Sequence, residues 1–202
     1  MLRNPLALDE FRLWYHIPDE SVDLHADSED ANLWIRHALL CNARSVEVID
    51  WVNELHLDNT VFASKCLLTS LLLSCVFLIP GFFRNLQMGC TVLKHLILRC
   101  CTIYDPEISS QTLKVLTIDG ECHCTYEGRA SISIPSLIDL EFSAPGSVPL
   151  LKNVESLVTA SISVGTADTQ VDDICQFLRS LSGVTNLEFY YEGRTVCFLI
   201  LN

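Results

Sequence analysis

The stretch Leu93-Lys94-His95-Leu96-Ile97-Leu98 sets a pattern that recurs along the chain: an apolar residue, two variable residues, Leu, one variable residue and another apolar residue. Further copies are Leu113-Lys114-Val115-Leu116-Thr117-Ile118, Leu137-Ile138-Asp139-Leu140-Glu141-Phe142 and Val184-Thr185-Asn186-Leu187-Glu188-Phe189. Strands with an apolar inner face and a freely varying outer face are typical of stacked repeats. The pattern predicts an architecture built to stack and to bind, rather than one that carries fixed chemistry.

The spacing of the key leucines agrees with a leucine-rich repeat. Leu71, Leu96, Leu116 and Leu140 follow one another at steps of 25, 20 and 24 residues, within the roughly 20–29 residues of such repeats. We place an earlier copy at residues 52–57, with Leu55 as its key residue, and later copies at Leu157 and Leu187. These copies make about seven irregular units. They predict an α/β fold, a leucine-rich-repeat solenoid with a curved parallel sheet and irregular or helical outer segments.

The chain divides into two predicted parts, an irregular acidic N-terminal segment at residues 1–29 and the repeat domain at residues 30–202. Within the repeat domain we expect a helix at residues 30–43. Its apolar stripe would contain Leu33, Trp34, His37, Leu40 and Cys41. A second helix is expected from Thr169 to Leu181, where Thr169 can cap the first turn and Asp172 and Asp173 suit its positive end.

Composition limits the classes of partner and the compartment. The formal net charge is -12, which argues against nucleic acid and against an anionic membrane surface, since both attract basic proteins. Most of the ten cysteines occupy positions of the apolar pattern, where free Cys packs as a small hydrophobe. The chain also has no Asn-X-Ser/Thr acceptor and no signal-peptide order at its N-terminus. We therefore expect an intracellular protein of the cytoplasm or nucleus.

One uncharged run supports an alternative interpretation. The run from Cys66 to Phe83 is flanked by Lys65 and Arg84, and its length would just span a bilayer as a helix. Against this, the run contains Pro80 and Gly81 together with three hydroxyl side chains, and its Leu68-Thr69-Ser70-Leu71-Leu72-Leu73 also fits the repeat. A membrane-attached repeat protein stays open as an alternative, although we favour no membrane contact.

Chemistry-bearing motifs are few. Cys122, His123 and Cys124 have metal-ligand side chains, but no second Cys or His pair follows at a suitable spacing, so an inter-repeat loop is favoured over a metal site. Cys100-Cys101 follows a repeat strand and is interpreted as satisfying backbone groups of the turn, with a redox role as the alternative. We find no catalytic or phosphate-binding motif. We therefore predict a non-enzyme without a cofactor or metal.

Outward positions of the repeat strands are the candidate partner-binding residues, as a strip on the concave face. They are Glu54, His56, His95, Ile97, Arg99, Thr117, Asp119, Asp139, Glu141, Glu188 and Tyr190. The strip is mixed but mostly acidic, which suits a protein or peptide with basic character. A merely solvated face is the alternative for each residue. The identity of the target protein does not follow from these residues.

Part of the chain resembles the repeat region of plant F-box/leucine-rich-repeat proteins. The residues that carry the likeness are Gly89-Cys90-Thr91-Val92-Leu93-Lys94-His95-Leu96-Ile97-Leu98-Arg99-Cys100-Cys101 and then Ile108-Ser109-Ser110-Gln111-Thr112-Leu113-Lys114-Val115-Leu116-Thr117-Ile118. The resemblance extends roughly from Trp34 to Phe189. It implies the target-recruiting repeats of a Skp–cullin–F-box ubiquitin-ligase receptor.

The resemblance does not extend to the adaptor-binding part of that family. Before Trp34 the chain lacks the Leu-Pro-x-x-(Leu/Ile) opening of an F-box, and His16-Ile17-Pro18-Asp19-Glu20 is only a faint echo of it. The residues after Val196 leave no room for the FBD region of many relatives. We therefore expect a truncated receptor, whose Skp adaptor would bind only if an F-box were supplied elsewhere.

Overall fold

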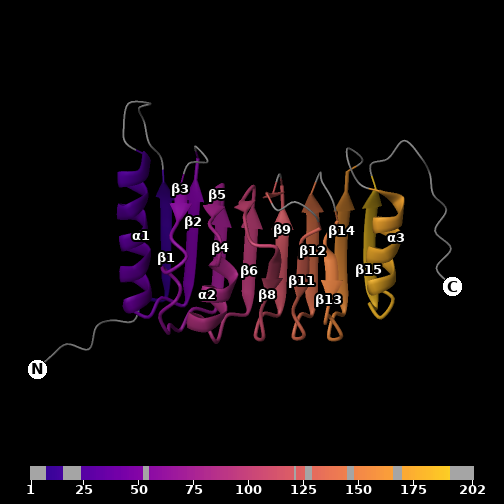
Figure 1. The fold of residues 1–202 in the computed structure, drawn as a ribbon. Coiled ribbons are helices and arrows are strands. Elements are labelled where there is room, and N and C mark those ends of the chain that lie inside the picture. Colours follow the sequence, from indigo (N-terminus) through magenta and orange to yellow (C-terminus); the bar gives the residue numbers. More distant parts are fainter. Residues whose placement is uncertain are drawn as a thin grey trace, which may run out of the picture.

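Three parallel sheets and three helices make a mixed α/β fold in the residues that the structure describes. The structure is a computed structural model, and it describes residues 8–15, 24–51, 55–120, 122–125, 129–144, 148–165 and 170–191. From one end of the molecule to the other, successive segments of the chain lie side by side (Figure 1). The α/β class and the parallel sheets agree with the sequence prediction.

The large sheet has eight strands, ordered β1-β2-β4-β6-β9-β12-β14-β15. Its strands are β1 (Glu10–Tyr15), β2 (Ser45–Asp50), β4 (Ser70–Ser74), β6 (His95–Arg99), β9 (Val115–Asp119), β12 (Asp139–Ala144), β14 (Thr159–Val164) and β15 (Asn186–Tyr191). All neighbouring pairs are parallel. Parallel neighbours need crossover connections, and these connections build the rest of the fold.

Two smaller parallel sheets formed by these connections cover the inner face of the large sheet. The first return sheet contains β3 (Leu55–Leu57), β5 (Val76–Leu78), β7 (Thr102–Ile103) and β10 (His123–Cys124). The second return sheet contains β8 (Glu107–Ser109), β11 (Ser131–Ser133) and β13 (Leu150–Lys152). The core lies between these return sheets and the large sheet, where alternate strand residues are buried.

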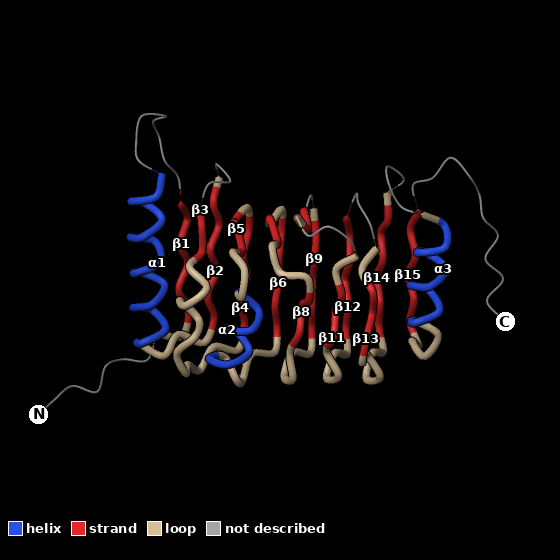
Figure 2. Tube along the Cα trace, viewed as in Figure 1, coloured by secondary structure: helices blue, strands red, loops and turns tan. Residues whose placement is uncertain are grey.

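The helices are α1 (Leu24–Leu40), α2 (Phe82–Gly89) and α3 (Val171–Ser180). α1 contacts β1 and β3, α2 contacts β8, and α3 contacts β13. Figure 2 shows α1 at one end of the row of strands and α3 at the other. The helices therefore take the place of return strands where the chain supplies an amphipathic segment.

The repeat is more regular in the structure than in the sequence pattern. One register column of the large sheet passes through Val46, Leu71, Leu96, Leu116, Leu140, Ala160 and Leu187, at steps of 25, 25, 20, 24, 20 and 27 residues. The expected copy at Leu55 is therefore misplaced, because β3 belongs to the first return sheet. The expected strand at Leu157 is also corrected, since Leu157 precedes β14 and the small Ala160 occupies the column.

A left-handed residue turns the chain out of three consecutive strands of the large sheet. Cys75 (φ 57°), Cys100 (φ 50°) and Gly120 (φ 72°) directly follow β4, β6 and β9. Non-glycine residues rarely adopt this conformation. Backbone hydrogen bonds from Cys75 N to Arg99 O (2.8 Å) and from Cys100 N to Asp119 O (3.1 Å) tie successive turns together. The same backbone bend therefore recurs in each of these units.

The N-terminal part of the chain differs from the expectation. The segment expected to be irregular contains β1, whose six residues pair in register with β2, and α1 begins at Leu24 rather than at residue 30. The sequence of β1 is Glu-Phe-Arg-Leu-Trp-Tyr. Polar and apolar residues alternate from Glu10 to Leu13, which is the pattern of a half-buried strand. The expectation of an irregular segment is corrected for these residues.

The buried face of α1 is also not the expected one. Ala31, Ile35, Ala38 and Leu39 are buried, together with Ser28 and Asn32. Leu33, Trp34 and Leu40 of the expected stripe are 56%, 50% and 76% exposed. Asn32 faces β3, where its Nδ2 donates to His56 O (3.0 Å) and its Oδ1 accepts from Asp58 N (3.1 Å). A polar residue that pairs with a strand edge, and small alanines that allow close approach, thus decide the orientation of the helix.

The second predicted helix is confirmed as α3. It buries Ile174 and Phe177 along with Leu178, and it has Asp172 and Asp173 in its first turn. Thr169, the expected cap, lies outside the described residues. Gln170 stands at the N-cap with no side-chain cap hydrogen bond.

Candidate functional site

The outer face of the large sheet, the face turned away from the core, carries nine of the residues predicted to bind a partner. They are His95, Ile97 and Arg99 of β6, Thr117 and Asp119 of β9, Asp139 and Glu141 of β12, and Glu188 and Tyr190 of β15. Because the register is parallel throughout, Ile97, Thr117 and Glu141 form one row, which continues through Ser161 to Glu188. The structure therefore brings these residues together on one surface.

One predicted residue does not join this face. His56 lies on β3 in the first return sheet, where its ring stacks on Phe77 with centroids 4.5 Å apart. In this unit the strand that belongs to the large sheet is β2 and not the predicted strand around Leu55. Val46 and Val48 of β2 are the buried residues, and β2 pairs with β4. His56 is thus removed from the predicted strip. Glu54 lies outside the described residues.

Thr117 has a different role from the one expected of an outward residue. It is only 8% exposed, and its Oγ1 donates to Oε2 of Glu141 at 3.2 Å. A hydroxyl that donates to a carboxylate holds the charged group in place. Thr117 therefore orients Glu141 on the outer face.

A hollow of about 340 Å³ lies on the outer face over β9, β12, β14 and β15. In the register, Ser161 stands between Glu141 and Glu188, and Thr159 stands between Asp139 and Asn186. The small hydroxyl side chains of β14 leave space between the longer side chains of its two neighbours. The hollow is therefore built by a change of side-chain size across three adjacent strands.

The hollow is acidic. Asp139, Glu141 and Glu188 line it, and none of its lining residues is Lys, Arg or His. Because β12 and β15 are separated by one strand, Glu141 and Glu188 lie about 10 Å apart across the sheet. Several carboxylates on one side of a hollow raise the local concentration of cations. The geometry suits a lysine or arginine side chain that enters between the two glutamates.

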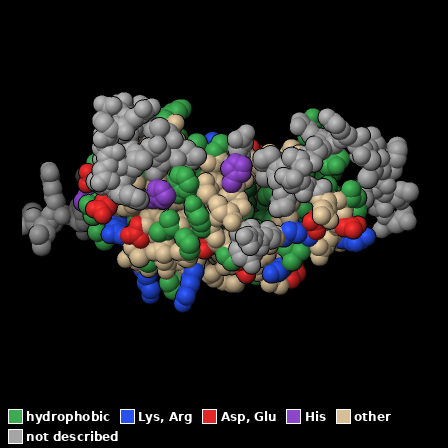
Figure 3. Space-filling model, turned by 45° about the horizontal axis from the view of Figure 1, so that its top comes forward, with side chains coloured by type: hydrophobic (Ala, Val, Ile, Leu, Met, Phe, Trp, Pro, Cys, Tyr) green, Lys and Arg blue, Asp and Glu red, His purple; other side chains and the backbone are tan. Residues whose placement is uncertain are grey.

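The far end of the outer face has another character. Arg12 of β1 forms ion pairs with Glu10 (Nη2–Oε1, 2.7 Å) and with Glu47 of β2 (Nε–Oε2, 3.3 Å). Trp14 is 67% exposed beside them on β1. Sequence reasoning missed these residues, although the alternation in β1 was a usable signal. Figure 3 shows hydrophobic, acidic and basic side chains interspersed over the side of the molecule that is turned to the viewer.

The Cys122-His123-Cys124 cluster shows no metal-site geometry. Within the described ranges, no three His, Cys, Asp or Glu side chains are grouped so that they could hold a metal ion. Cys122 is buried, whereas His123 and Cys124 on β10 are exposed. The three residues are consecutive in sequence but do not converge on one point.

Cys122 and Cys101 instead satisfy the backbone of the turns after β6 and β9. Cys101 Sγ donates to Leu73 O (3.4 Å) or Arg99 O (3.3 Å), and Cys101 N donates to Cys122 Sγ (3.3 Å). Cys122 Sγ similarly lies 3.3 Å from Asp119 O. The hydrogen bond with Cys122, together with burial, raises the pKa of Cys101. A raised thiol pKa disfavours the reactive thiolate, so the turn role predicted for Cys101 agrees with the structure.

The other cysteines follow the apolar pattern only in part. Cys66 and Cys90 are buried, while Cys75, Cys100 and Cys175 are partly exposed. Cys197 lies outside the described residues. All nine cysteines of the described segments are free thiols.

The apolar run from Cys66 to Phe83 does not form a long helix. It contains β4 and β5, and α2 begins at Phe82. No helix among the described residues is both long and apolar enough to cross a membrane. The run is accounted for as one unit of the stack.

These features define a class of protein: an α/β stack of parallel strands with an acidic hollow on the outer face of its large sheet. A comparison of the chain with protein-family models, curated proteins and solved structures found no match.

Proposed function

We propose that this chain is a non-enzymatic recognition module that binds a protein segment rich in Lys or Arg on the outer face of its large sheet. The observation that carries the proposal is the hollow lined by Asp139, Glu141 and Glu188 with Ser161 between the two glutamates. An extended basic peptide lying across β12, β14 and β15 would place a cationic side chain in it. The net charge of -12 would add long-range attraction for such a partner.

We further propose that the stack is a leucine-rich-repeat solenoid. Three features support this assignment: the recurring leucine column, parallel strands that stack in sequence order, and turn cysteines that hydrogen-bond to the backbone of neighbouring units. In such folds each unit contacts mainly its neighbours, and the repeated face forms an extended binding surface. The proposed partner site lies on the face formed by the large sheet.

The resemblance to plant F-box/leucine-rich-repeat proteins supports a more specific proposal. In that setting the outer face would recruit a target for ubiquitin transfer, and the chain itself would carry out no chemistry. Skp-adaptor binding would require an F-box supplied elsewhere. The basic target segment and the adaptor would then occupy separate surfaces.

The proposal is tested with defined peptides and the full chain. We expect peptides with Lys or Arg at alternate positions to bind saturably, with an affinity that falls as salt rises, and uncharged peptides of equal length not to bind. The double variant Glu141→Lys/Glu188→Lys should weaken binding at least about tenfold, because each carboxylate supplies a charge-assisted hydrogen bond. Isothermal titration calorimetry at two salt concentrations measures both effects.

A matched control separates a specific site from general attraction. Glu155 is exposed in the turn before β14 and does not line the hollow, so Glu155→Lys makes away from the site the same charge change that Glu141→Lys alone makes within it. We expect Glu155→Lys to retain binding within about twofold, and Glu141→Lys alone to weaken it by more than that. If Glu141→Lys and Glu155→Lys lose affinity equally, the attraction is a property of the net charge and the site assignment fails.

A further inference from the structure

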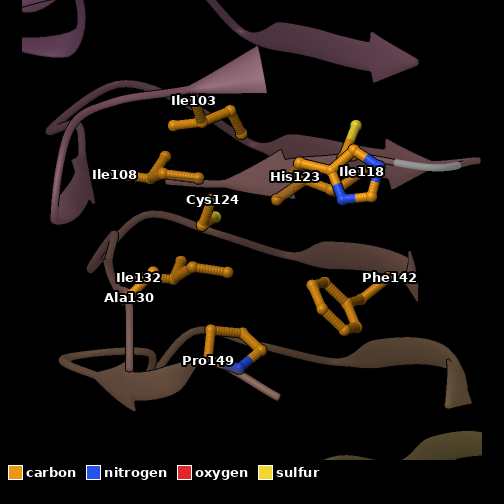
Figure 4. Close-up of a pocket in the computed structure, with 10 residues that line it drawn as sticks. Ile103, Ile108, Ile118, His123, Cys124, Ala130, Ile132, Phe142 and Pro149 are labelled. Carbon is orange, nitrogen blue, oxygen red and sulfur yellow. The ribbon is translucent and has the colours of Figure 1, made fainter. Parts of the chain in front are cut away.

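A second hollow, of about 140 Å³, lies between the large sheet and the return sheets and is not part of the outer face. We call it the interior hollow; the exposed residues His123 and Cys124 border it. Ile118 and Phe142 border it from the large sheet, Ile108 and Ile132 from the second return sheet, and His123 and Cys124 from β10. Figure 4 shows these side chains arranged around an open space, with Phe142 on one side and Ile108 and Cys124 on another.

The position of this interior hollow follows from the topology. The first return sheet has β10 as its last strand in the described part of the chain. The inner side chains of β9 and β12 therefore face the return strands β8 and β11 of the second return sheet. In the first return sheet, β10 pairs with β7 on one side and has no described strand on its other side. A neighbouring space beside α2, which shares Ile108 with this hollow, measures only about 10 Å³. Side chains therefore fill the space beside α2 but leave a hollow beside β10 and β11.

The chemistry of the walls favours an apolar occupant. Seven of the ten residues that line the hollow have hydrocarbon side chains, so a water molecule would find few of the hydrogen-bond partners it needs. An apolar cavity of about 150 Å³ is large enough for a benzene ring. Phe142 offers a ring for an edge-to-face contact, and the Cys124 thiol offers a polarisable neighbour.

His123 gives the interior hollow one polar contact. Its side chain is exposed, and no hydrogen bond from its ring to another described residue is present. An imidazole ring has one nitrogen that donates and one that accepts when neutral. It can therefore bind a hydroxyl group at the edge of an otherwise apolar site.

We propose that the interior hollow is a binding site for a monocyclic aromatic molecule with one hydroxyl group, of which phenol is the simplest. The ring lies against Phe142, Ile118 and Ile132, and the hydroxyl hydrogen-bonds to the imidazole of His123. This site is independent of the peptide site on the outer face, because the two hollows share no lining residue.

The test measures phenol binding to the full chain by equilibrium dialysis and locates it by ligand-to-methyl nuclear Overhauser effects. We expect saturable binding at one site, contacts to the methyl groups of Ile118 and Ile132, and an affinity for phenol about tenfold above that for benzene. His123→Ala should remove the preference for phenol while benzene binding is retained. Uptake that rises linearly without saturation, or contacts to other methyl groups, would overturn the proposal.

Filling the hollow gives an independent test. Ala130 lines it and is partly exposed, so Ala130→Leu should abolish binding of both ligands. Ile132→Phe fills the space from another wall and is the second variant if Ala130→Leu fails to fold. Ala63→Leu is the matched control, since Ala63 is equally partly exposed but lines a different hollow near α1. Unchanged binding in a folded filled variant contradicts the site, and so does its loss in Ala63→Leu.

Discussion

The region around α2 and the region around β11 solve the same packing problem differently. In the α2 region (residues 55–93), Phe82 meets Phe62 and Phe83 edge to face, with ring centroids 5.7 and 5.3 Å apart, and the neighbouring hollow is about 10 Å³. In the β11 region (residues 101–151), short strands replace the helix and a hollow of about 140 Å³ remains. The large sheet is continuous through both regions, so the return segments decide how well the interior is filled.

The largest effect is expected at Gly89, where α2 packs directly against the backbone of residues 62–64. A Cβ added to Gly89 would overlap Phe62 O and would stand 2.7 Å from Ser64 O and 2.8 Å from Ala63 C. These are backbone atoms, which cannot rotate away, so Gly89→Ala should lower the free energy of unfolding by about 3 kcal/mol. Urea denaturation followed by circular dichroism measures the loss.

Gly183 is the matched control for that substitution. Its added Cβ would meet nothing within 4 Å. We expect Gly183→Ala to change the free energy of unfolding by less than about 0.5 kcal/mol. Equal losses at Gly89 and Gly183 would mean that the α2 region is not tighter than the rest.

In the β11 region, one polar side chain joins the return segments to α3. Arg129 is 18% exposed in its side chain; its Nη1 binds Asp173 Oδ1 (2.8 Å) and Gln176 Oε1 (2.7 Å), while its Nε donates to Val148 O (3.0 Å). It thereby fastens α3 to the return segments. Arg129→Ala should cost about 1–3 kcal/mol, because the partly buried acceptors lose their donor.

Two comparisons make the Arg129 prediction specific. Arg129→Lys keeps the charge but cannot reproduce the planar set of donors, so it should recover only part of the loss. Arg12→Ala removes two ion pairs whose shared Arg side chain is 55% exposed, and should cost less than about 1 kcal/mol. A full recovery in Arg129→Lys would show that charge alone fastens α3.

A small stabilising effect is expected from filling the open space in the β11 region. Ala130→Leu adds apolar volume to a space that already exists, and cavity filling commonly stabilises by about 0.5–2 kcal/mol. Ala63→Leu, beside the polar hollow near α1, should remain within about 0.5 kcal/mol of the unchanged protein. Thermal and urea unfolding of the two variants measure the difference, and destabilisation by Ala130→Leu would mean that the space does not accept a larger side chain.

Periodicity was sufficient to predict the strands that carry the leucine column, including those at Leu96, Leu116 and Leu140. It failed where the column residue is Ala160 or Val46, because a small or β-branched residue does not complete the leucine pattern. It also assigned β3 to the wrong sheet, since an apolar-x-apolar triplet is equally compatible with a return strand. Spacing alone cannot tell which of two parallel layers a short strand joins.

The outer face was predictable in outline and not in detail. Alternation along each strand identified Asp139, Glu141 and Glu188 as outward residues, and the parallel register brings them together. The hollow between them depends on Ser161 in the adjacent strand, whose position follows only from the register. The outward orientation of Trp34 was missed for a similar reason, because Asn32 pairs with β3 across more than 20 residues of sequence.

The smallest effect concerns an exposed ion pair in the α2 region. Arg36 of α1 binds Asp58, whose carboxylate also accepts hydrogen bonds from Thr60 N (2.8 Å) and Thr60 Oγ1 (2.9 Å). Burial raises the pKa of Asp58, but the Thr60 hydrogen bonds and the Arg36 charge outweigh it, so the pKa lies below its ordinary value. Nuclear magnetic resonance titration of the carboxyl carbon should show this lowered pKa in the folded protein.

A lowered folded-state pKa sets the sign of the pH dependence. The contribution of Asp58 to stability is fully present above the pKa of the unfolded chain, near 3.9, and is lost as the pH falls through the lower folded-state value. Because both side chains are 40% exposed, solvent screening keeps the contribution below about 1 kcal/mol. Arg36→Gln should therefore raise the pKa of Asp58 and lower the stability at pH 7, while its stability converges with that of the unchanged protein in strong acid. A stability difference that persists undiminished in strong acid would show that Arg36 acts through its hydrogen bond to Thr60 Oγ1 (2.7 Å) rather than through the charge of Asp58.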